Sequence, residues 1–383
     1  MLEQVLTFSS DCDDNFFTKV PAAPAVFLLR GEGEPYVSKT ANLRRRLQRL
    51  LGMPAEQSKR LNLRERVQEI EFTLTGSDLE SQLLLYKLLR EYFPKTYAAR
   101  LRLRPAALVR LRLENAYPRA SVTTRLGRTT GKDAFYGPFP SRAAAEKFAS
   151  DALDFFKMRR CVDDLHPDPS LPGCVYSEMK MCLAPCYKGC GDAEYHAEVS
   201  RVQAFFDTAG QSLRRDLAGQ REQASAQLAF EDASAIHSKL EKLKHLLSQL
   251  PEIVQPLDRM RALIVQPGAD TGRVELFHFA KVMLHGPIPF SIEQTGEPQS
   301  MESRLHTLIE TFPSSDAASA TERIEHLAIL KRWYYRSHHT GEIFFADEKG
   351  TWPLRRIVRG IGRVHKGEKA EDSAIFSAIP PGQ

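Results

Sequence analysis

The chain contains 383 residues, of which 42% are hydrophobic and 26% are charged, and its formal net charge is +5. This composition excludes a largely disordered or fibrous protein and predicts two or three globular domains. No apolar run reaches the roughly 18 residues of a transmembrane helix, so we expect no membrane association. Acidic residues near the N-terminus argue against a secretory signal, and we expect a cytoplasmic protein.

The first part of the chain, residues 1–115, carries alternating strand and helix signals. Two β-prone segments around a Gly-Glu-Gly-Glu turn predict a hairpin over 24–38. Leucines at helical spacing begin after Asn42, with arginines on the opposite face. A capping-box pattern that starts at Ser77 predicts a second helix over 77–93. Together these signals predict a small α/β domain.

Two different segments follow. Residues 116–191 are rich in Pro, Gly, Tyr and Cys, and contain a predicted helix over 142–157. Residues 192–250 are predicted to be helical almost throughout, with a break near Gly210. Apolar residues at three- and four-residue steps in this second segment predict a helical hairpin.

The last part of the chain is predicted to form a small α+β domain over 251–365, with strands over 261–292 and a helix over 320–337. We assign no function to this domain. RRIVRG at 355–360 is expected to be extended, and the overlapping string IVRGIG at 357–362 has the pattern of the turn in a helix-hairpin-helix DNA-binding element. Residues 366–383 are predicted to be a disordered tail. The expected fold class is therefore α+β and multidomain.

Several of these segments resemble a known family. PAVFLLRGEGEPYVSKTANLRRRLQRLL (24–51) resembles the opening of a GIY-YIG nuclease domain, in the form found in the UvrC family of bacterial excinucleases. FYGPFPS (135–141) and GCVYSEMKMCLAPC (173–186) continue the pattern of that family in the same order. QLAFEDASAIHSKLEKL (227–243) is similar to its UVR motif, the helical hairpin that docks on UvrB. The RNase H-like half of the family has no visible counterpart here.

The resemblance implies a nuclease site built from three tyrosines, a lysine, an arginine, an asparagine and a metal-binding glutamate. Three positions are retained, as Tyr36, Lys39 and Arg46, and four are replaced, by Phe27, Leu50, Leu85 and Tyr97. The replacement at Leu85 matters most, because a Mg²⁺ or Mn²⁺ ion needs oxygen ligands. Asp78 and Glu80 lie on other turns or faces of the predicted helix and do not replace the lost ligand. We therefore expect weak or absent cleavage.

Two alternatives remain open for this first domain. One is an active structure-specific endonuclease with a rearranged metal site, making a single incision at damaged DNA. The other concerns Arg44, Arg45 and Arg49, which we predict to contact DNA phosphates. The less favoured interpretation is that the same arginines form only the solvated face of an amphipathic helix.

Four cysteines predict a metal centre: Cys161, Cys174, Cys182 and Cys186. Four thiolates suit either a [4Fe–4S] cluster or zinc, and the resemblance to UvrC implies the cluster. The alternative is a set of small buried side chains without a metal. A cluster-containing interaction protein that does not bind DNA is a third hypothesis for the function of the whole chain.

The predicted hairpin carries an apolar stripe that two helices cannot bury by themselves. A partner that completes a four-helix interface would cover it, and the resemblance identifies that partner as UvrB. The predicted partner-binding residues are Leu228, Phe230, Glu231, Ile236 and Leu240. Alternatively, this stripe is only the internal seam of the hairpin. The preferred hypothesis is a UvrC-like DNA-repair protein that binds DNA and UvrB and has an impaired nuclease site.

Overall fold

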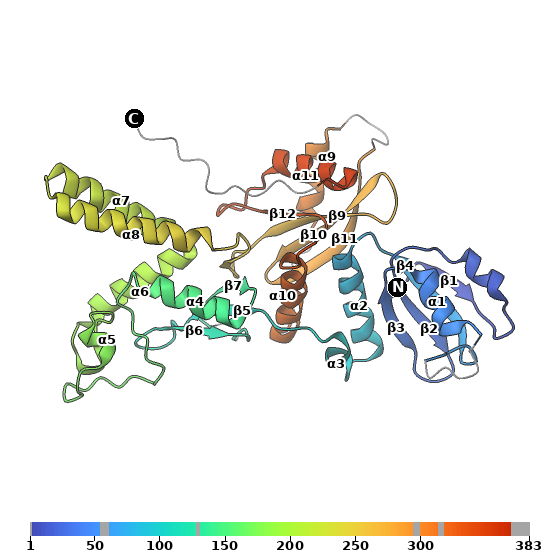
Figure 1. Cartoon of the computed structure of the whole chain (residues 1–383), viewed down its shortest axis with the longest axis horizontal. Helices are drawn as coiled ribbons and strands as arrows, with labels where there is room; N and C mark the ends of the chain where they lie inside the picture. Colours follow the sequence, from blue (N-terminus) through green and yellow to red (C-terminus); the bar gives the residue numbers. More distant parts are fainter. Residues whose placement is uncertain (1, 54–60, 128–130, 294–298, 313–317, 369–383) are drawn as a thin grey trace.

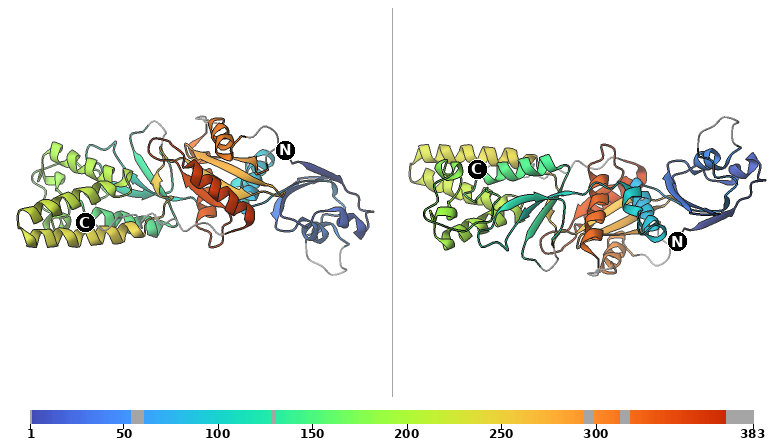
Figure 2. Two further views of the ribbon diagram at one scale, coloured as in Figure 1. Left: turned by 90° about the horizontal axis from the view of Figure 1, so that it is seen from above. Right: turned by 90° about the horizontal axis from the view of Figure 1, so that it is seen from below.

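The computed structural model describes residues 2–53, 61–127, 131–293, 299–312 and 318–368. Within these ranges the chain forms three four-stranded antiparallel sheets with helices packed around them. The expected α+β multidomain class is confirmed. The molecule is elongated, with the first sheet at one end and a long helical hairpin at the other (Figures 1 and 2). No helix of the described ranges combines the length and apolar character needed to cross a bilayer.

The first sheet has the strand order β1-β4-β2-β3. It is built from β1 (Gln4–Thr7), β2 (Ala25–Gly31), β3 (Tyr36–Thr40) and β4 (Val67–Leu74), with a short 3₁₀ helix η1 (Asp14–Lys19) between the first two. The predicted hairpin is confirmed as β2 and β3. Helix α1 (Leu43–Leu51) starts where predicted, because the Asn42 side chain accepts a hydrogen bond from the Arg45 backbone N–H and caps it. Its leucines are buried against the sheet.

Helix α2 (Asp78–Tyr92) connects this first module to the rest of the molecule. The Ser77 side chain caps it as predicted, and the Glu80 carboxylate accepts from the backbone N–H of Gly76. One side of α2 packs on β2, through Leu88 among others, and another side joins the largest core of the molecule, through Leu83 among others. The short helix α3 (Tyr97–Leu101) follows it.

The second sheet has the order β6-β5-β7-β8, from β5 (Ala107–Leu111), β6 (Ala120–Thr123), β7 (Ala134–Phe139) and β8 (Gln255–Pro256). Helix α4 (Arg142–Leu153), shorter than predicted, packs on this sheet. The cysteine-rich loop contains α5 (Val175–Glu178) and the 3₁₀ helix η2 (Pro185–Tyr187). Three longer helices then precede β8: α6 (Asp192–Asp207), α7 (Gln211–Ala226) and α8 (Phe230–Ser248). Helices α7 and α8 form the predicted hairpin, and the break near Gly210 is confirmed.

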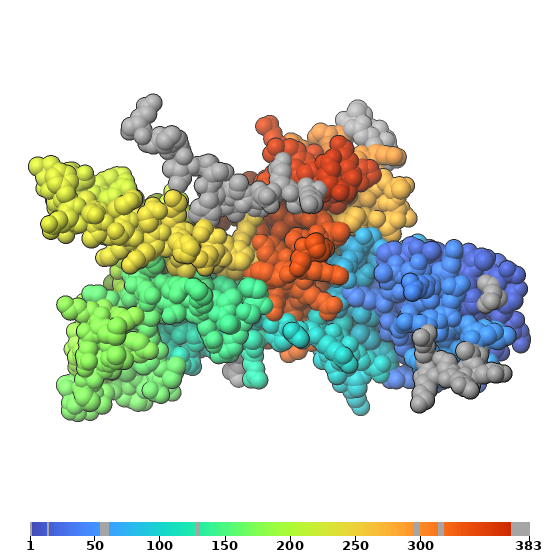
Figure 3. All heavy atoms as spheres, viewed as in Figure 1, coloured from blue at the N-terminus to red at the C-terminus, as the bar shows by residue number. Residues whose placement is uncertain are grey.

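The third sheet has the order β11-β10-β9-β12, from β9 (Ala262–Pro267), β10 (Arg273–Ala280), β11 (Met283–Ser291) and β12 (Glu342–Phe345). The strands predicted over 261–292 are confirmed. Helix α10 (Ala320–Tyr334) lies between one face of this sheet and α2. Helices α9 (Met301–Glu310) and α11 (Leu354–Lys366) cover the other face. In the space-filling view this central part adjoins the N-terminal module (Figure 3).

One local expectation for the chain was wrong. Residues 357–362 are neither extended nor a turn, because they lie inside the continuous helix α11. Ile357, Ile361 and Val364 repeat at helical spacing and are buried against the sheet. Of the predicted disordered tail, residues 369–383 lie outside the described residues.

Candidate functional site

Two of the three retained residues of the predicted nuclease site meet where α1 packs on the first sheet. Tyr36 is the first residue of β3, and Arg46 lies on the face of α1 next to it. The Arg46 guanidinium donates a hydrogen bond to the Tyr36 hydroxyl, at an N–O distance of 2.6 Å. Phe27 stands on the adjacent strand with its ring centroid 6.1 Å from that of Tyr36. A phenyl ring therefore occupies the place predicted for a second hydroxyl.

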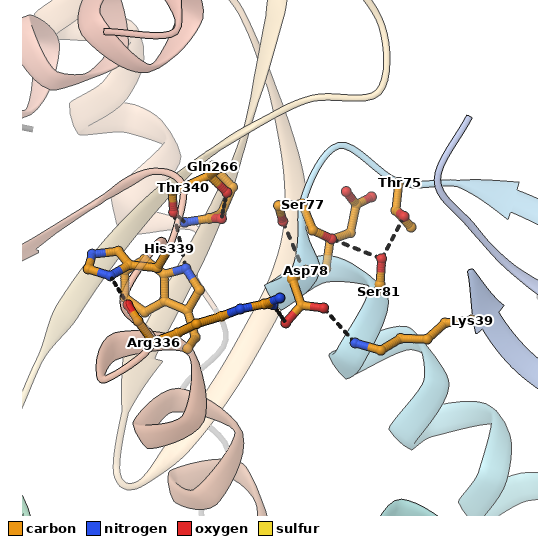
Figure 4. A network of polar contacts seen from close by, with 11 residues as sticks. Lys39, Thr75, Ser77, Asp78, Ser81, Gln266, Arg336, His339 and Thr340 are labelled. Atoms are coloured by element: carbon orange, nitrogen blue, oxygen red, sulfur yellow. Dashed lines mark hydrogen bonds and ion pairs between the residues drawn. The ribbon is translucent and has the colours of Figure 1, made fainter. Parts of the chain in front are cut away.

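The third retained residue, Lys39, contacts a different partner. Its Nζ donates to Oδ1 of Asp78 at 2.7 Å, and Oδ2 of Asp78 lies 2.6 Å from the Arg336 guanidinium (Figure 4). Asp78 is the first residue of α2, where the helix dipole also favours a carboxylate. The three side chains form an ion-pair chain from strand β3, through α2, to the segment that follows α10.

Charges in this chain shift the acid–base behaviour of its members. Burial alone would raise the pKa of Asp78, but the hydrogen bond and charge of Lys39, together with Arg336 and Arg332, outweigh it and lower that pKa. For Lys39, burial dominates and lowers the pKa, although Asp78 opposes the effect. The carboxylate therefore stays ionised and keeps the lysine occupied.

Arg336 is held in place by the polypeptide around it. Nε1 of Trp333 and the Gln266 side-chain amide both donate to the carbonyl of Thr340, at 3.1 and 3.0 Å. His339 Nδ1 lies 3.1 Å from the carbonyl of Arg336 (Figure 4). The end of α10 is thereby fixed against strand β9, and Arg336 is directed at Asp78.

The remaining replaced positions have structural contacts. Leu50 is buried in the core beneath α1, and Leu85 packs among apolar residues between α2 and the sheet. The Tyr97 hydroxyl donates to Glu325 of α10 at 2.9 Å, and Glu325 also accepts from Tyr86 of α2 at 2.8 Å. Leu85 and Tyr97, two positions at which the resemblance implies catalytic groups, thus help to hold α2 and α3 in place.

Sequence reasoning missed the partners of these residues. The sequence gives Asp78 no role in the predicted site, whereas the structure places its carboxylate on Lys39. Arg336 and Glu325 carry no local signal, because their contacts to α2 and α3 join residues that are distant in the sequence. The sequence shows only that these residues carry complementary charges or polar groups, and this does not identify which of them will pair.

The predicted DNA-contacting arginines divide into two kinds. Arg44 donates from Nε to the carbonyl of Val20 at 2.8 Å and from Nη2 to that of Thr18 at 3.2 Å, so it anchors the loop before β2. Arg45 and Arg49 are exposed one turn apart on the outer side of α1. Among the arginines of α1, Arg45 and Arg49 are thus the two whose side chains are exposed.

The four predicted metal-binding cysteines lie in one irregular region after α4. Burial raises the pKa of Cys182 to about 11, and the other three thiols add to this effect because they are within electrostatic range. Hydrogen bonds reach the sulfur atoms, from Arg159 to Cys161 at 3.4 Å and from the Ala184 backbone to Cys182 at 3.3 Å. Donors of this kind stabilise metal-bound thiolates. The donor set therefore fits a thiolate-bound metal in chemistry, although in the described residues no three His, Cys, Asp or Glu side chains are arranged to hold one.

The predicted partner-binding stripe divides along the hairpin. Leu228 and Phe230 stand at its tip with exposed fractions of 71% and 66%, and Glu231 is exposed beside them. Ile236 and Leu240 instead pack partly buried against the core. The apolar surface open to a partner is therefore concentrated at the turn between α7 and α8.

Comparisons with known proteins point to the same family as the motifs. Residues 108–205 match the family model described as the middle domain of UvrC/Cho excinucleases. This chain is similar to UvrC proteins. It shares 26% identity with UvrABC system protein C of Rickettsia bellii over 279 residues, which is 72% of this chain and 43% of that protein. The same protein of Rickettsia felis is 26% identical over 293 residues, which is 76% of this chain and 44% of that protein.

These matches support the resemblance drawn from the sequence. The chain spans less than half the length of the UvrC relatives it matches. The matched middle-domain segment begins in β5 and ends within α6, so it contains α4 and all four cysteines. No solved structure matches this chain.

Proposed function

We propose that this chain is a UvrC-like protein of nucleotide excision repair that binds DNA and a UvrB-type partner, and that its first module does not cut DNA. The middle-domain match and the similarity to UvrABC system protein C support a role in excision repair. The hairpin tip, with Leu228 and Phe230 exposed, offers an apolar surface for the partner.

The observation that carries the loss of cleavage is the ion-pair chain at Lys39. Hydrolysis of a phosphodiester needs cations free to meet the developing negative charge, and in nucleases of this kind it usually also uses a metal held by carboxylates. Lys39 is instead paired with Asp78, and Asp78 with Arg336. Leu85, at the position of the metal ligand, lies among apolar side chains. A metal placed there would find no carboxylate from that position.

DNA binding would then depend on charge. Arg45 and Arg49 extend from α1 into solvent and suit phosphate groups, which require only positive charge and carry no base identity. Cys161, Cys174, Cys182 and Cys186 would hold a [4Fe–4S] cluster or a zinc ion, and such a group would cross-link the loop that they share. These cysteines belong to the segment that matches the middle domain.

A second candidate function is supported by the contact between Tyr36 and Arg46. Their hydrogen bond keeps a hydroxyl and a guanidinium together, as a single-incision endonuclease would need for its nucleophile and its anionic transition state. This candidate also requires a rearranged metal site. A third candidate, an iron–sulfur interaction protein without affinity for DNA, would leave Arg45 and Arg49 as solvated side chains.

An incision assay separates these functions. The full chain is incubated with damaged duplex and Mg²⁺ or Mn²⁺, with and without UvrB, and the products are resolved by length. We expect DNA binding without incision. Robust incision that is lost in Tyr36→Phe would establish the endonuclease, whereas failure to bind DNA at low salt would support the third candidate.

A further inference from the structure

A cavity of about 660 Å³ opens in the C-terminal domain, away from every residue considered above. It is lined by residues of α9, of the segment after α9 and of the loop before α11, and these two helices cover one face of the third sheet. Its wall includes His278 of β10, Phe312 after α9, and Trp352 in the loop before α11. Pockets for small ligands occupy roughly 300–1,000 Å³, so this volume is ample for one nucleotide.

The wall on one side is aromatic. The His278 and Phe312 rings stack with their centroids 4.7 Å apart at 20°, and the Trp352 ring meets His278 edge-on at 6.0 Å. His278 is only 5% exposed, and its Nδ1 has no hydrogen-bond partner in the described part of the chain. A buried polar atom without a partner is costly unless a ligand or water satisfies it. Burial also lowers the pKa of His278 to about 4, so the ring is neutral near pH 7.

Charges of both signs line the rest of the cavity. Of its four carboxylates, Asp258 lies near Arg259, Glu310 near His306, Asp347 accepts from the backbone of its own loop, and Glu348 is the fourth. Arg261 and Lys349 also line the cavity and are exposed, and neither has an ion-pair partner in the described ranges. A Cβ at Gly350 would lie 2.9 Å from the Arg261 guanidinium, so the glycine leaves room for that group beside the loop. The Asp347 carboxylate accepts from the backbone of Lys349 at 2.9 Å and of Thr351 at 2.7 Å, which fixes the loop that presents Lys349.

We propose that this cavity binds one unstacked nucleotide of single-stranded DNA, with its base against Trp352 and its phosphate at Arg261 and Lys349. An aromatic surface beside unpaired cations is the combination by which proteins hold single strands, because every base has a stacking face and every nucleotide a phosphate. A base inside an intact duplex cannot reach such a wall, since both of its faces are covered. The proposal rests on the proposed DNA-repair function and adds a preference for unpaired strands.

Tryptophan fluorescence provides a direct readout. The chain has two tryptophans, and Trp333 is buried with its Nε1 bonded to Thr340, so a ligand in the cavity acts on Trp352. The full chain is titrated with a single-stranded oligothymidine, with the matching duplex, with an abasic oligonucleotide of the same length, and with free thymidine monophosphate. We expect quenching and binding that is at least tenfold tighter for the oligothymidine than for the abasic strand.

Variants locate the binding. Trp352→Ala should lose about tenfold in affinity for the oligothymidine, and Trp352→Phe should keep most of it. Lys349→Ala should reduce the salt slope by about 0.7, while Lys366→Ala, which is exposed on α11 outside the cavity, should bind like the parent. Retained affinity in a folded Trp352→Ala variant, equal binding of the abasic strand, or binding of the free nucleotide alone would overturn the proposal. Duplex binding through Arg45 and Arg49 would persist in each of these outcomes. The experiment therefore distinguishes failure of the single-strand site from failure of the proposed DNA-binding function.

Discussion

The side chains of Lys39 and Asp78 meet with Nζ and Oδ1 2.7 Å apart, and this contact joins strand β3 to the first turn of helix α2. Asp78 extends the contact to Arg336 beyond α10. One carboxylate therefore holds two cations that belong to distant parts of the chain. Lys39, a residue of the predicted nuclease site, thus takes part in the contact between the first module and the C-terminal domain.

Removing this carboxylate should affect both stability and DNA binding. Asp78→Ala leaves Lys39 and Arg336 facing each other, and because the group is partly exposed we expect a loss of only about 1–2 kcal/mol in the free energy of unfolding. The two released cations should steepen the salt dependence of duplex binding, by about 0.9 in log–log slope for each new phosphate contact. Thermal unfolding and salt titrations measure the two effects.

The control for this variant is Asp151→Ala, which removes an exposed carboxylate paired with Lys147 on α4. It should change neither quantity measurably, since exposed pairs of this kind contribute little. If Asp78→Ala behaves like Asp151→Ala in both assays, the contact with Lys39 has no energetic importance.

A second prediction concerns the pH dependence of stability through Glu80. Burial raises its pKa to about 7 from an ordinary value of 4.5, with Glu275 adding to the shift and Arg273 opposing it. Between about pH 4.5 and pH 7 the folded chain therefore holds a proton that the unfolded chain has lost. Stability contributed by this group must fall as pH rises through that window, by roughly 3 kcal/mol at most.

Glu80→Gln should remove that slope, because the amide oxygen can still accept from Gly76 and carries no charge to bury. Unfolding midpoints measured from pH 4.5 to pH 8 should then be flatter than in the parent, and higher at pH 8. Glu91→Gln, on the exposed side of the same helix, should keep the parental profile. A parental slope in Glu80→Gln would show that another group governs this window.

The sequence predicted those parts of the fold that depend on interactions between residues close together in the chain. The hairpin of β2 and β3 and the cap at Ser77 were predictable, because turn chemistry and capping act over a few residues. The string at 357–362 was mispredicted, because its two glycines indicate a turn in isolation. In the fold, Gly360 lies against the Phe344 ring, where a Cβ would come within 2.3 Å of a ring carbon, so the glycine serves close helix–sheet packing.

The same limit applies to the candidate site, whose local features were predictable and whose long-range contacts were not. The family resemblance implied a site with Tyr36, Lys39 and Arg46, and in the structure Tyr36 and Arg46 do meet. It could not identify Arg336 as the second partner of Asp78, or Glu325 as the acceptor of the Tyr97 hydroxyl, because tertiary packing alone brings these pairs together. Sequence periodicity carries no information on which distant charges will pair.

The cysteine region supports a spectroscopic prediction. If the four thiolates bind a [4Fe–4S] cluster, anaerobically purified protein should be brown and absorb in the visible range, and Cys174→Ser should bleach it. Cys190→Ser is the matched control, since Cys190 lies outside the quartet, and its colour should persist. Stoichiometric zinc without iron would exclude the cluster and keep the ligand set, whereas no bound metal would leave the four cysteines without this role.

The exposed arginines of α1 predict how duplex affinity depends on salt. Arg45→Ala combined with Arg49→Ala should lower the affinity for every duplex sequence alike and reduce the log–log salt slope by up to about 1.8, or 0.9 per contact. Arg142→Ala on α4, an exposed arginine paired within its own helix, is the control and should bind like the parent. Unchanged affinity and slope in the double variant would show that these arginines are solvated residues of the helix surface and do not contact DNA.

The hairpin tip gives the sharpest test of the partner. Phe230 is 66% exposed, so truncating it removes little internal packing and Phe230→Ala should unfold at the parental temperature. If UvrB covers this ring, the same change should cost about 2 kcal/mol of binding free energy, or about thirtyfold in affinity.

Pull-down and titration with UvrB measure that loss, and Lys239→Ala, exposed on α8, should bind like the parent. DNA affinity and metal content should stay unchanged in both variants. A Phe230→Ala variant that binds UvrB normally would show that UvrB does not cover this ring, and it would remove the support for a UvrB-type partner. A variant that unfolds would contradict the exposure of Phe230, on which the assignment of the hairpin tip as the docking surface depends.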